Sequence, residues 1–233
     1  MNQRSVATAV LLLLLLLGAW LAPPVAAAPL TVSLSNGITT ATCADGAACD
    51  TSPLAGVVSF TSVLGTTTLS LTGVGSGSPA LPGLMMDLAY SVTQSMSGPG
   101  GTVTIQASET DQTALAALFS AVLGGTQGPG GTTTFAIFAS NTNALFAQTT
   151  PICAGATSSI GAVALSCNGG PYTASPASLT EMVTLQIPGG AYSASGDLLL
   201  TARGVPAPSA LLLMGAGLGG LAVLVRARRT KAQ

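Results

Sequence analysis

Short stretches of alternating apolar and polar residues, separated by Gly and Pro, run through residues 28–204. In one of them Val103, Ile105 and Ala107 alternate with polar residues, which is the period of a strand with one buried face. Many such stretches with turn residues between them are typical of an antiparallel sandwich. The pattern therefore predicts an all-β fold, an antiparallel β-sandwich of about ten strands. The clearest strand segments are 30–34, 57–63, 67–74, 88–94, 101–108, 132–140, 182–187 and 197–202.

One segment, residues 109–125, departs from this alternation and predicts a short amphipathic helix. Glu109 and Asp111 occupy its first turn, where acids stabilise a helix, and Gly124 follows its last apolar residue. Its polar face has no Lys or Arg, so we expect the apolar stripe to cover the sandwich rather than a membrane. The apolar residues at helical spacing are Leu115, Leu118, Phe119 and Val122.

The N-terminal segment has the order of a secretory signal peptide. One base, Arg4, precedes an uncharged apolar stretch that ends at Leu21, and small residues follow. We therefore predict a leader over residues 1–27, with Ala28 as the first residue of the mature protein. The alternative is an uncleaved membrane anchor, but its apolar core is short compared with the roughly 20 residues that span a bilayer.

A second apolar run, residues 210–225, lies close to the C-terminus. As a helix it would rise about 24 Å, slightly less than a hydrocarbon core of about 30 Å. Basic residues follow at once, and such a cluster holds the adjoining end of a transmembrane helix in the cytoplasm. We therefore predict a C-terminal transmembrane helix over 210–225, a basic tail over 226–233, and a sandwich outside the cell. The basic residues are Arg226, Arg228, Arg229 and Lys231.

The residues before this helix complete a recognisable arrangement. They are Val205, Pro206, Ala207, Pro208 and Ser209. A proline-flanked motif, an apolar Gly-rich helix and a terminal Arg cluster together resemble the PEP-CTERM sorting signal of exported bacterial proteins, although Ala207 stands where that family has Glu. The resemblance covers residues 205–233 and implies processing by an exosortase, an integral-membrane cysteine protease. It also implies a Gram-negative host that makes exopolysaccharide, and a mature protein at the cell surface or in the extracellular matrix.

Charge is scarce and unevenly placed. Charged residues are only 6% of the chain, so hydroxyls and backbone groups must meet most of the water. Residues 28–204 contain one base, Arg203, and all seven acids, which gives this segment a formal charge of −6. Neutralising phosphates needs clustered Lys and Arg, so the composition excludes nucleic acid as a partner.

The four cysteines form two pairs that are local in sequence, Cys43 with Cys49 and Cys153 with Cys167. An exported chain meets an oxidising compartment, so we expect disulfides. Three pairings are possible, and the short separations favour the two local ones. A metal site would need more closely spaced cysteines or histidine ligands, and the chain has no histidine, so we expect no metal.

No arrangement of residues typical of an enzyme is evident. Catalysis without histidine would need paired carboxylates. Asp45 and Asp50 lie in a turn-like segment, with a weak calcium site as the alternative, and Glu109 and Asp111 would cap the predicted helix. The glycines within 215–220 have the spacing of a dinucleotide fingerprint, but no strand precedes them and no acid follows. We therefore expect a non-enzymatic protein without a cofactor.

Two functions remain. The first is an exported, disulfide-supported surface or matrix protein that an exosortase-type protease sorts at its C-terminus. The second is a polysaccharide-binding module held by a single C-terminal transmembrane helix. Sugar rings usually stack on exposed aromatic side chains, and the candidates here are Tyr90, Tyr172 and Tyr192. The expected partners are thus the exosortase, the membrane and an exopolysaccharide.

Overall fold

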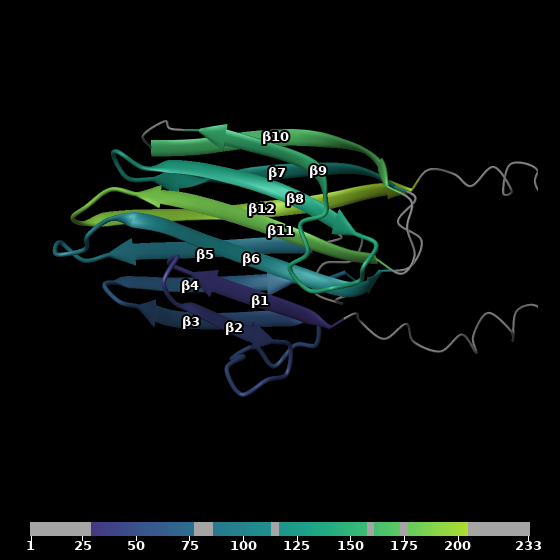
Figure 1. Cartoon of the computed structure of the whole chain (residues 1–233), viewed down its shortest axis with the longest axis horizontal. Coiled ribbons are helices and arrows are strands. Elements are labelled where there is room, and N and C mark those ends of the chain that lie inside the picture. Colours follow the sequence, from purple (N-terminus) through teal and green to yellow (C-terminus); the bar gives the residue numbers. More distant parts are fainter. Residues whose placement is uncertain (1–28, 77–85, 113–116, 158–160, 173–176, 205–233) are drawn as a thin grey trace, which may run out of the picture.

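The computed structural model describes residues 29–76, 86–112, 117–157, 161–172 and 177–204. These residues form two antiparallel sheets stacked face to face (Figure 1). The strands are β1 (Leu30–Ser35), β2 (Thr40–Ala44), β3 (Val57–Leu64), β4 (Thr67–Val74), β5 (Met86–Gln94), β6 (Gly101–Gln112), β7 (Ala117–Gln127), β8 (Thr132–Ser140), β9 (Thr150–Thr157), β10 (Gly161–Tyr172), β11 (Ala177–Ile187) and β12 (Tyr192–Gly204).

Each sheet has six strands. We name sheet A the one with the order β2-β1-β6-β11-β8-β9, and sheet B the one with the order β10-β7-β12-β5-β4-β3. Every strand pair is antiparallel. The predicted all-β antiparallel sandwich is therefore confirmed, and each of the eight predicted segments lies in a strand.

The core lies between the sheets and is built mainly from aliphatic side chains. Ile105 and Leu185 point inward from sheet A, and Leu88, Leu123 and Leu198 point inward from sheet B; none of the five is exposed to solvent. Each buried side chain of this size contributes about 2 kcal/mol relative to an exposed one. The alternation along each strand therefore fixes which face of its sheet packs inward.

The predicted helix over residues 109–125 is wrong. Its described residues belong to β6 and β7, and the described part of the chain contains no helix. β7 lies between β10 and β12, which satisfy its backbone groups on both sides. Phe119 is buried, whereas Leu118 and Val122 are each about half exposed, which is strand alternation rather than one apolar helical face.

Both local disulfides are confirmed. Cys43 in β2 is bonded to Cys49 in the loop that follows, and Cys153 in β9 is bonded to Cys167 in β10. Since β9 belongs to sheet A and β10 to sheet B, the second disulfide joins the two sheets at one edge. The described residues have no free cysteine.

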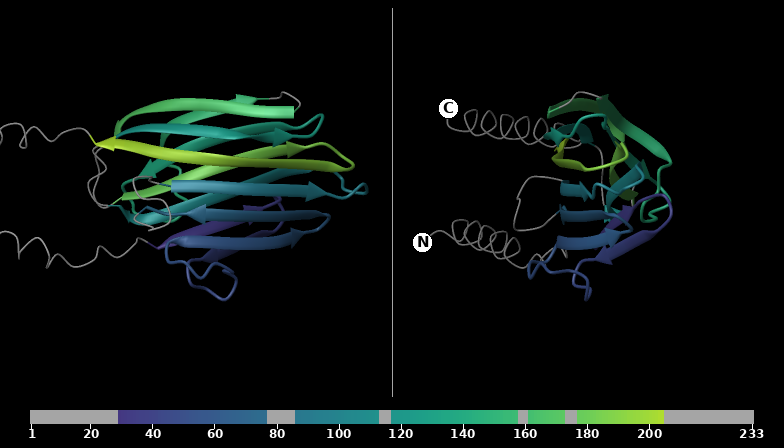
Figure 2. Two further views of the ribbon diagram at one scale, coloured as in Figure 1. Left: turned by 180° about the vertical axis from the view of Figure 1, so that it is seen from behind. Right: turned by 90° about the vertical axis from the view of Figure 1, so that its left-hand side faces the viewer.

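The sandwich has two distinct ends. β1 begins and β12 ends at the same end, which we call the near end, and the opposite one is the far end (Figures 1 and 2). The predicted leader, 1–27, and the predicted sorting segment, 205–233, lie outside the described residues. Within the residues that the structure describes, no helix is long and apolar enough to span a membrane.

The disulfide that joins the sheets should contribute more stability than the local one. The bridged cysteines are 14 residues apart in Cys153–Cys167 and six apart in Cys43–Cys49. Loop-closure entropy then gives about 3 kcal/mol and about 2 kcal/mol, respectively. Chemical unfolding of the C153A/C167A and C43A/C49A double variants measures how much free energy of unfolding each variant loses relative to the native chain. A larger loss in C43A/C49A would contradict this ranking.

Candidate functional site

The outer face of sheet B carries a straight row of hydroxyl groups. The strand register aligns one residue from each of five neighbouring strands, and all five are exposed. Two hydroxyl–hydroxyl hydrogen bonds run along the row, between Thr61 and Ser70 at 3.0 Å and between Thr126 and Ser195 at 3.1 Å. We call this the sheet B hydroxyl row; its residues are Thr61, Ser70, Ser91, Ser195 and Thr126.

Sheet A has a similar row on its own outer face, formed by Thr40, Ser35, Thr104, Thr184 and Thr134. Here only Thr40 is exposed, and the others are half-buried. The loop between β8 and β9 also covers part of this face, because the Phe146 backbone N–H donates to Ser108 Oγ at 3.0 Å. Sheet B, seen from behind in Figure 2, thus presents the more open hydroxyl face.

Two of the three tyrosines expected for sugar stacking are buried, and the third is only partly exposed. Tyr90 and Tyr192 are each only 5% exposed, and Tyr172 is half-buried. Inward packing explains this, since Tyr90 and Tyr192 occupy core-facing positions of β5 and β12. None of the three tyrosines or five phenylalanines is an exposed side chain. The described aromatic side chains therefore offer no fully exposed ring for stacking.

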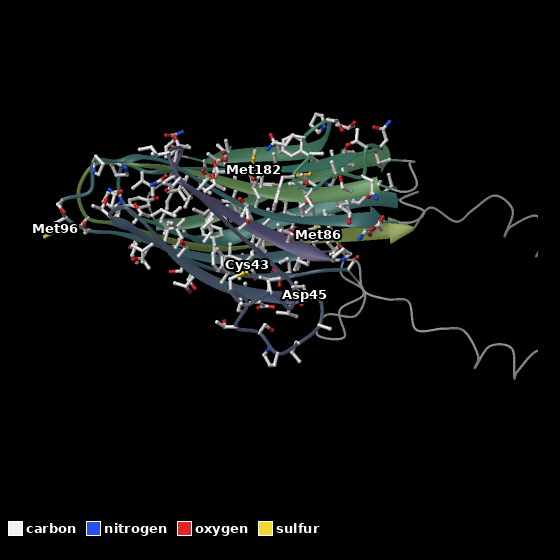
Figure 3. All side chains as sticks on the ribbon, turned by 60° about the horizontal axis from the view of Figure 1, so that its bottom comes forward. Cys43, Asp45, Met86, Met96 and Met182 are labelled. Atoms are coloured by element: carbon white, nitrogen blue, oxygen red, sulfur yellow. A yellow bond between two sulfur atoms is a disulfide. The ribbon has the colours of Figure 1, made fainter. Side chains whose placement is uncertain are left out.

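The far end holds an uncharged pocket of about 220 Å³. Its two amides are already occupied: Asn36 Oδ1 accepts from the backbone of Thr39, and Gln94 Nε2 donates to two carbonyl oxygens. Ile38 and Met96 project from neighbouring turns and are 90% and 86% exposed. Figure 3 shows Met96 at the tip of this end, and Met182 at the outer surface of sheet A. The pocket is apolar and offers few groups to a polar ligand.

Asp45 and Asp50 have structural roles in their loop, as a turn role predicts. Asp45 Oδ2 accepts from the backbone N–H of Gly56 at 2.8 Å, and Asp50 Oδ1 accepts from those of Ser52 and Ser59 at 2.8 and 2.9 Å. Among the described residues, no group of three or more potential ligands could hold a metal ion. The described structure therefore gives the alternative calcium site no support.

Glu109 and Asp111 do not cap a helix. Asp111 has a positive φ of 59° and exchanges hydrogen bonds with Asn143 on the loop between β8 and β9. Glu109 points into the sandwich and is fully buried. Its Oε2 accepts from Ser76 Oγ at 2.6 Å and from Gln112 Nε2 at 2.7 Å. These acids instead fasten the near end of β6 to its neighbours.

A second acid, Glu181, is buried beside Glu109. Ala107 and Glu181 are paired across β6 and β11, as are Glu109 and Leu179, so the two acids lie on a diagonal of the inner face. Neither oxygen of Glu181 has a hydrogen-bond partner in the described structure. Burial raises the pKa of Glu181 well above its usual range, and nearby acids add to this. Burial also raises the pKa of Glu109 to about 7, although hydrogen bonds from Ser76 oppose the shift.

A carboxyl pair lies on the outer side of sheet B, where Asp87 in β5 is hydrogen-bonded to Asp197 in β12. Burial raises the pKa of Asp87 to about 7, and the hydrogen bond and charge of Asp197 act in the same direction. Glu109 and Glu181 are closed off from solvent. Asp87, Glu109 and Glu181 are therefore carboxyl groups whose protonated form burial favours.

The sequence alone does not locate the hydroxyl rows of the two sheets. The alternation of Thr and Ser along each strand was visible, but the rows depend on which residues of different strands are paired. The sorting residues Val205 to Ser209 and the basic residues Arg226 to Lys231 lie outside the described residues, so their role stays a prediction.

Comparison with known proteins does not name a family. No protein-family model and no curated protein matches the chain. TmCBM61 in complex with β-1,4-galactotriose has a TM-score of 0.39 and 8% identity, over 66% of this chain and 92% of that one. The K1 cleaved adhesin domain of Lys-gingipain from Porphyromonas gingivalis W83 has a TM-score of 0.32 and 10% identity, over 64% and 98%. The CBM22-1 xylan-binding domain of Paenibacillus barcinonensis Xyn10C has a TM-score of 0.31 and 8% identity, over 65% and 88%. Likeness at this level assigns no function, which has to be inferred from the residues of this chain.

The buried acids predict that the protein loses stability as the pH rises. A carboxyl whose pKa is raised on folding contributes fully below its unfolded pKa, 4.5 for Glu109, and this contribution is lost as the pH rises through about 7. For Glu109 the loss is on the order of 3 kcal/mol. Urea unfolding between about pH 4 and pH 8 should show this decline for the native chain.

Glu181→Gln, which stays neutral at every pH, should flatten this decline. An E181Q profile as steep as that of the native chain would contradict the assignment of the effect to the buried acids.

Proposed function

We propose that the protein is an exported, non-enzymatic component of the cell surface or extracellular matrix, and that its sandwich binds neutral polysaccharide through sheet B. The observation that carries the proposal is the sheet B hydroxyl row, which presents five exposed hydroxyls in register without a charge among them. Hydroxyls both donate and accept, and so match the hydroxyls of a sugar chain.

Two further features support an extracellular site of action. Both pairs of cysteines form disulfides, which persist in oxidising compartments. The leader order of residues 1–27 also supports export. Sorting would then depend on residues 205–233, whose layout resembles the PEP-CTERM signal, with an exosortase-type protease and the membrane as partners during maturation. A Gram-negative host with an exopolysaccharide would supply both the protease and the ligand.

Polysaccharide binding is tested with the full-length protein in mild detergent, on immobilised dextran, laminarin, galactan and xylan. We expect retention on at least one of these neutral polymers. The double variant T126V/S195A removes two hydroxyls from the sheet B hydroxyl row and should weaken retention. The matched variant T134V/S35A removes the same groups from sheet A and should not. Absence of retention on all four polymers would overturn the binding proposal.

The sorting proposal is tested by the intact mass of the protein from its native host, with and without the host's exosortase gene. Cleavage near Pro208 only when the exosortase is present is the expected result. A mass that extends to Gln233 in both strains would contradict sorting, and the tail would then act as an ordinary membrane anchor. The P206A/P208A variant, which removes the flanking prolines, should keep the tail in the presence of exosortase.

A further inference from the structure

The middle of the outer face of sheet B is hollowed. The register places Ala89, Asp197, Gly124 and Ala164 in one row across β5, β12, β7 and β10. Apart from Asp197, this row contains only the two smallest residue types. The hollow has a volume of about 490 Å³, and Gly124, Gly196 and Asp197 are among its lining residues. We call it the transverse groove because it runs across the strands.

The two sides of the transverse groove differ in chemistry. The side toward the far end is formed by part of the sheet B hydroxyl row, namely Ser91, Ser195 and Thr126. The side toward the near end is aliphatic. Leu199 and Val122 are paired there, and the Val122 side chain is 48% exposed. The groove therefore has one side that can form hydrogen bonds with a ligand and one side that can pack against an apolar surface of it.

The charge of the transverse groove comes from acids. Asp197 is exposed in its floor, and Asp87 is paired with Leu199 in the neighbouring row. Asp87 Oδ1 is buried and has no hydrogen-bond partner among the described residues. The base of this sheet, Arg203, is six positions further along β12, about 20 Å at the rise of a strand. A polyanion would therefore meet repulsion here, whereas a neutral ligand would not.

We propose that the transverse groove binds one chain of an uncharged polysaccharide, lying across the strands of sheet B. A pyranose ring has hydroxyls around its edge and C–H groups on its faces. The hydroxyls suit the hydroxyl side of the groove, and the C–H groups suit its aliphatic side. The Asp197 carboxylate accepts hydrogen bonds from neighbouring sugar hydroxyls, and bonds to a charged acceptor are the strong ones. This inference rests on the proposed function, and adds the site, the ligand's charge and its direction.

The length of the groove fits a short run of sugars. Its lining residues come from three neighbouring strands, β5, β12 and β7. The two spacings between these strands, about 4.8 Å each, give roughly 10 Å, which accommodates one or two sugar rings in an extended chain. A glycine at position 124 is required for this depth, because any larger side chain there would project into the ligand's path.

Gly124 provides a sharp test, because a Cβ built there meets no atom within 4 Å. Gly124→Leu should therefore fill the groove without disturbing the fold. The matched control is Gly170→Leu in β10, where a Cβ also meets no atom within 4 Å but which is not part of the groove. A third variant, Asp197→Asn, keeps the shape of the side chain and removes its charge.

The affinity of the full-length protein in mild detergent is measured by titration with the neutral polymer that retains it best, and with polygalacturonate. We expect G124L and D197N to bind the neutral polymer at least about tenfold more weakly, and G170L to bind as the native chain does. Circular dichroism and urea unfolding of each variant check that the fold is kept.

The outcomes separate this inference from the proposed function. If the native chain binds the neutral polymer and G124L binds it equally well, the groove is wrong and polysaccharide binding stands. If the native chain binds no neutral polymer, both fail. Tighter binding of polygalacturonate than of the neutral polymer would overturn the assignment of an uncharged ligand.

Discussion

The antiparallel pairing of β12 with β5 on one side and β7 on the other is the constraint on which sheet B depends. A slip of one residue in either pairing would move Leu198 and Leu200 to the surface and bring Ser195 and Asp197 into the core. With charged residues at only 6% of the chain, few ion pairs are available to oppose such a slip. Aliphatic burial on one face and hydroxyls on the other must hold the register, and the surface chemistry follows from it.

Burial also determines the protonation state of the acids. Two of them, Glu109 and Glu181, are buried on the inner face of sheet A, where a charge would be costly, so the fold favours their protonated forms. Ionisation of either acid as the pH rises therefore destabilises the sandwich, and burial likewise raises the pKa of Asp87 on the outer side.

Sequence alternation revealed the strands whose outward residues are polar and whose inward residues are large, such as β6. It did not reveal β9 and β10, because Ala, Gly and Cys along them give little contrast between the two faces. The spacing of Leu118, Phe119 and Val122 predicts a helix because it fits a period of 3.6. In β7 Phe119 instead lies on the face opposite Leu118 and Val122, and pairing with β10 and β12 holds the segment as a strand. The local disulfides followed from spacing. The hydroxyl rows and the groove did not, because they require the register between strands that are distant in sequence.

The position of β12 also has a mechanical consequence. It lies inside sheet B, paired with β5 over nine residues and with β7 over eleven, and it ends at the near end of the sandwich. A pull on the chain beyond Gly204 acts along this strand, so it loads both ladders of hydrogen bonds together in shear instead of breaking them one after another. Tension between a tethered C-terminus and a polymer held on sheet B would thus be carried by the strand best placed to resist it.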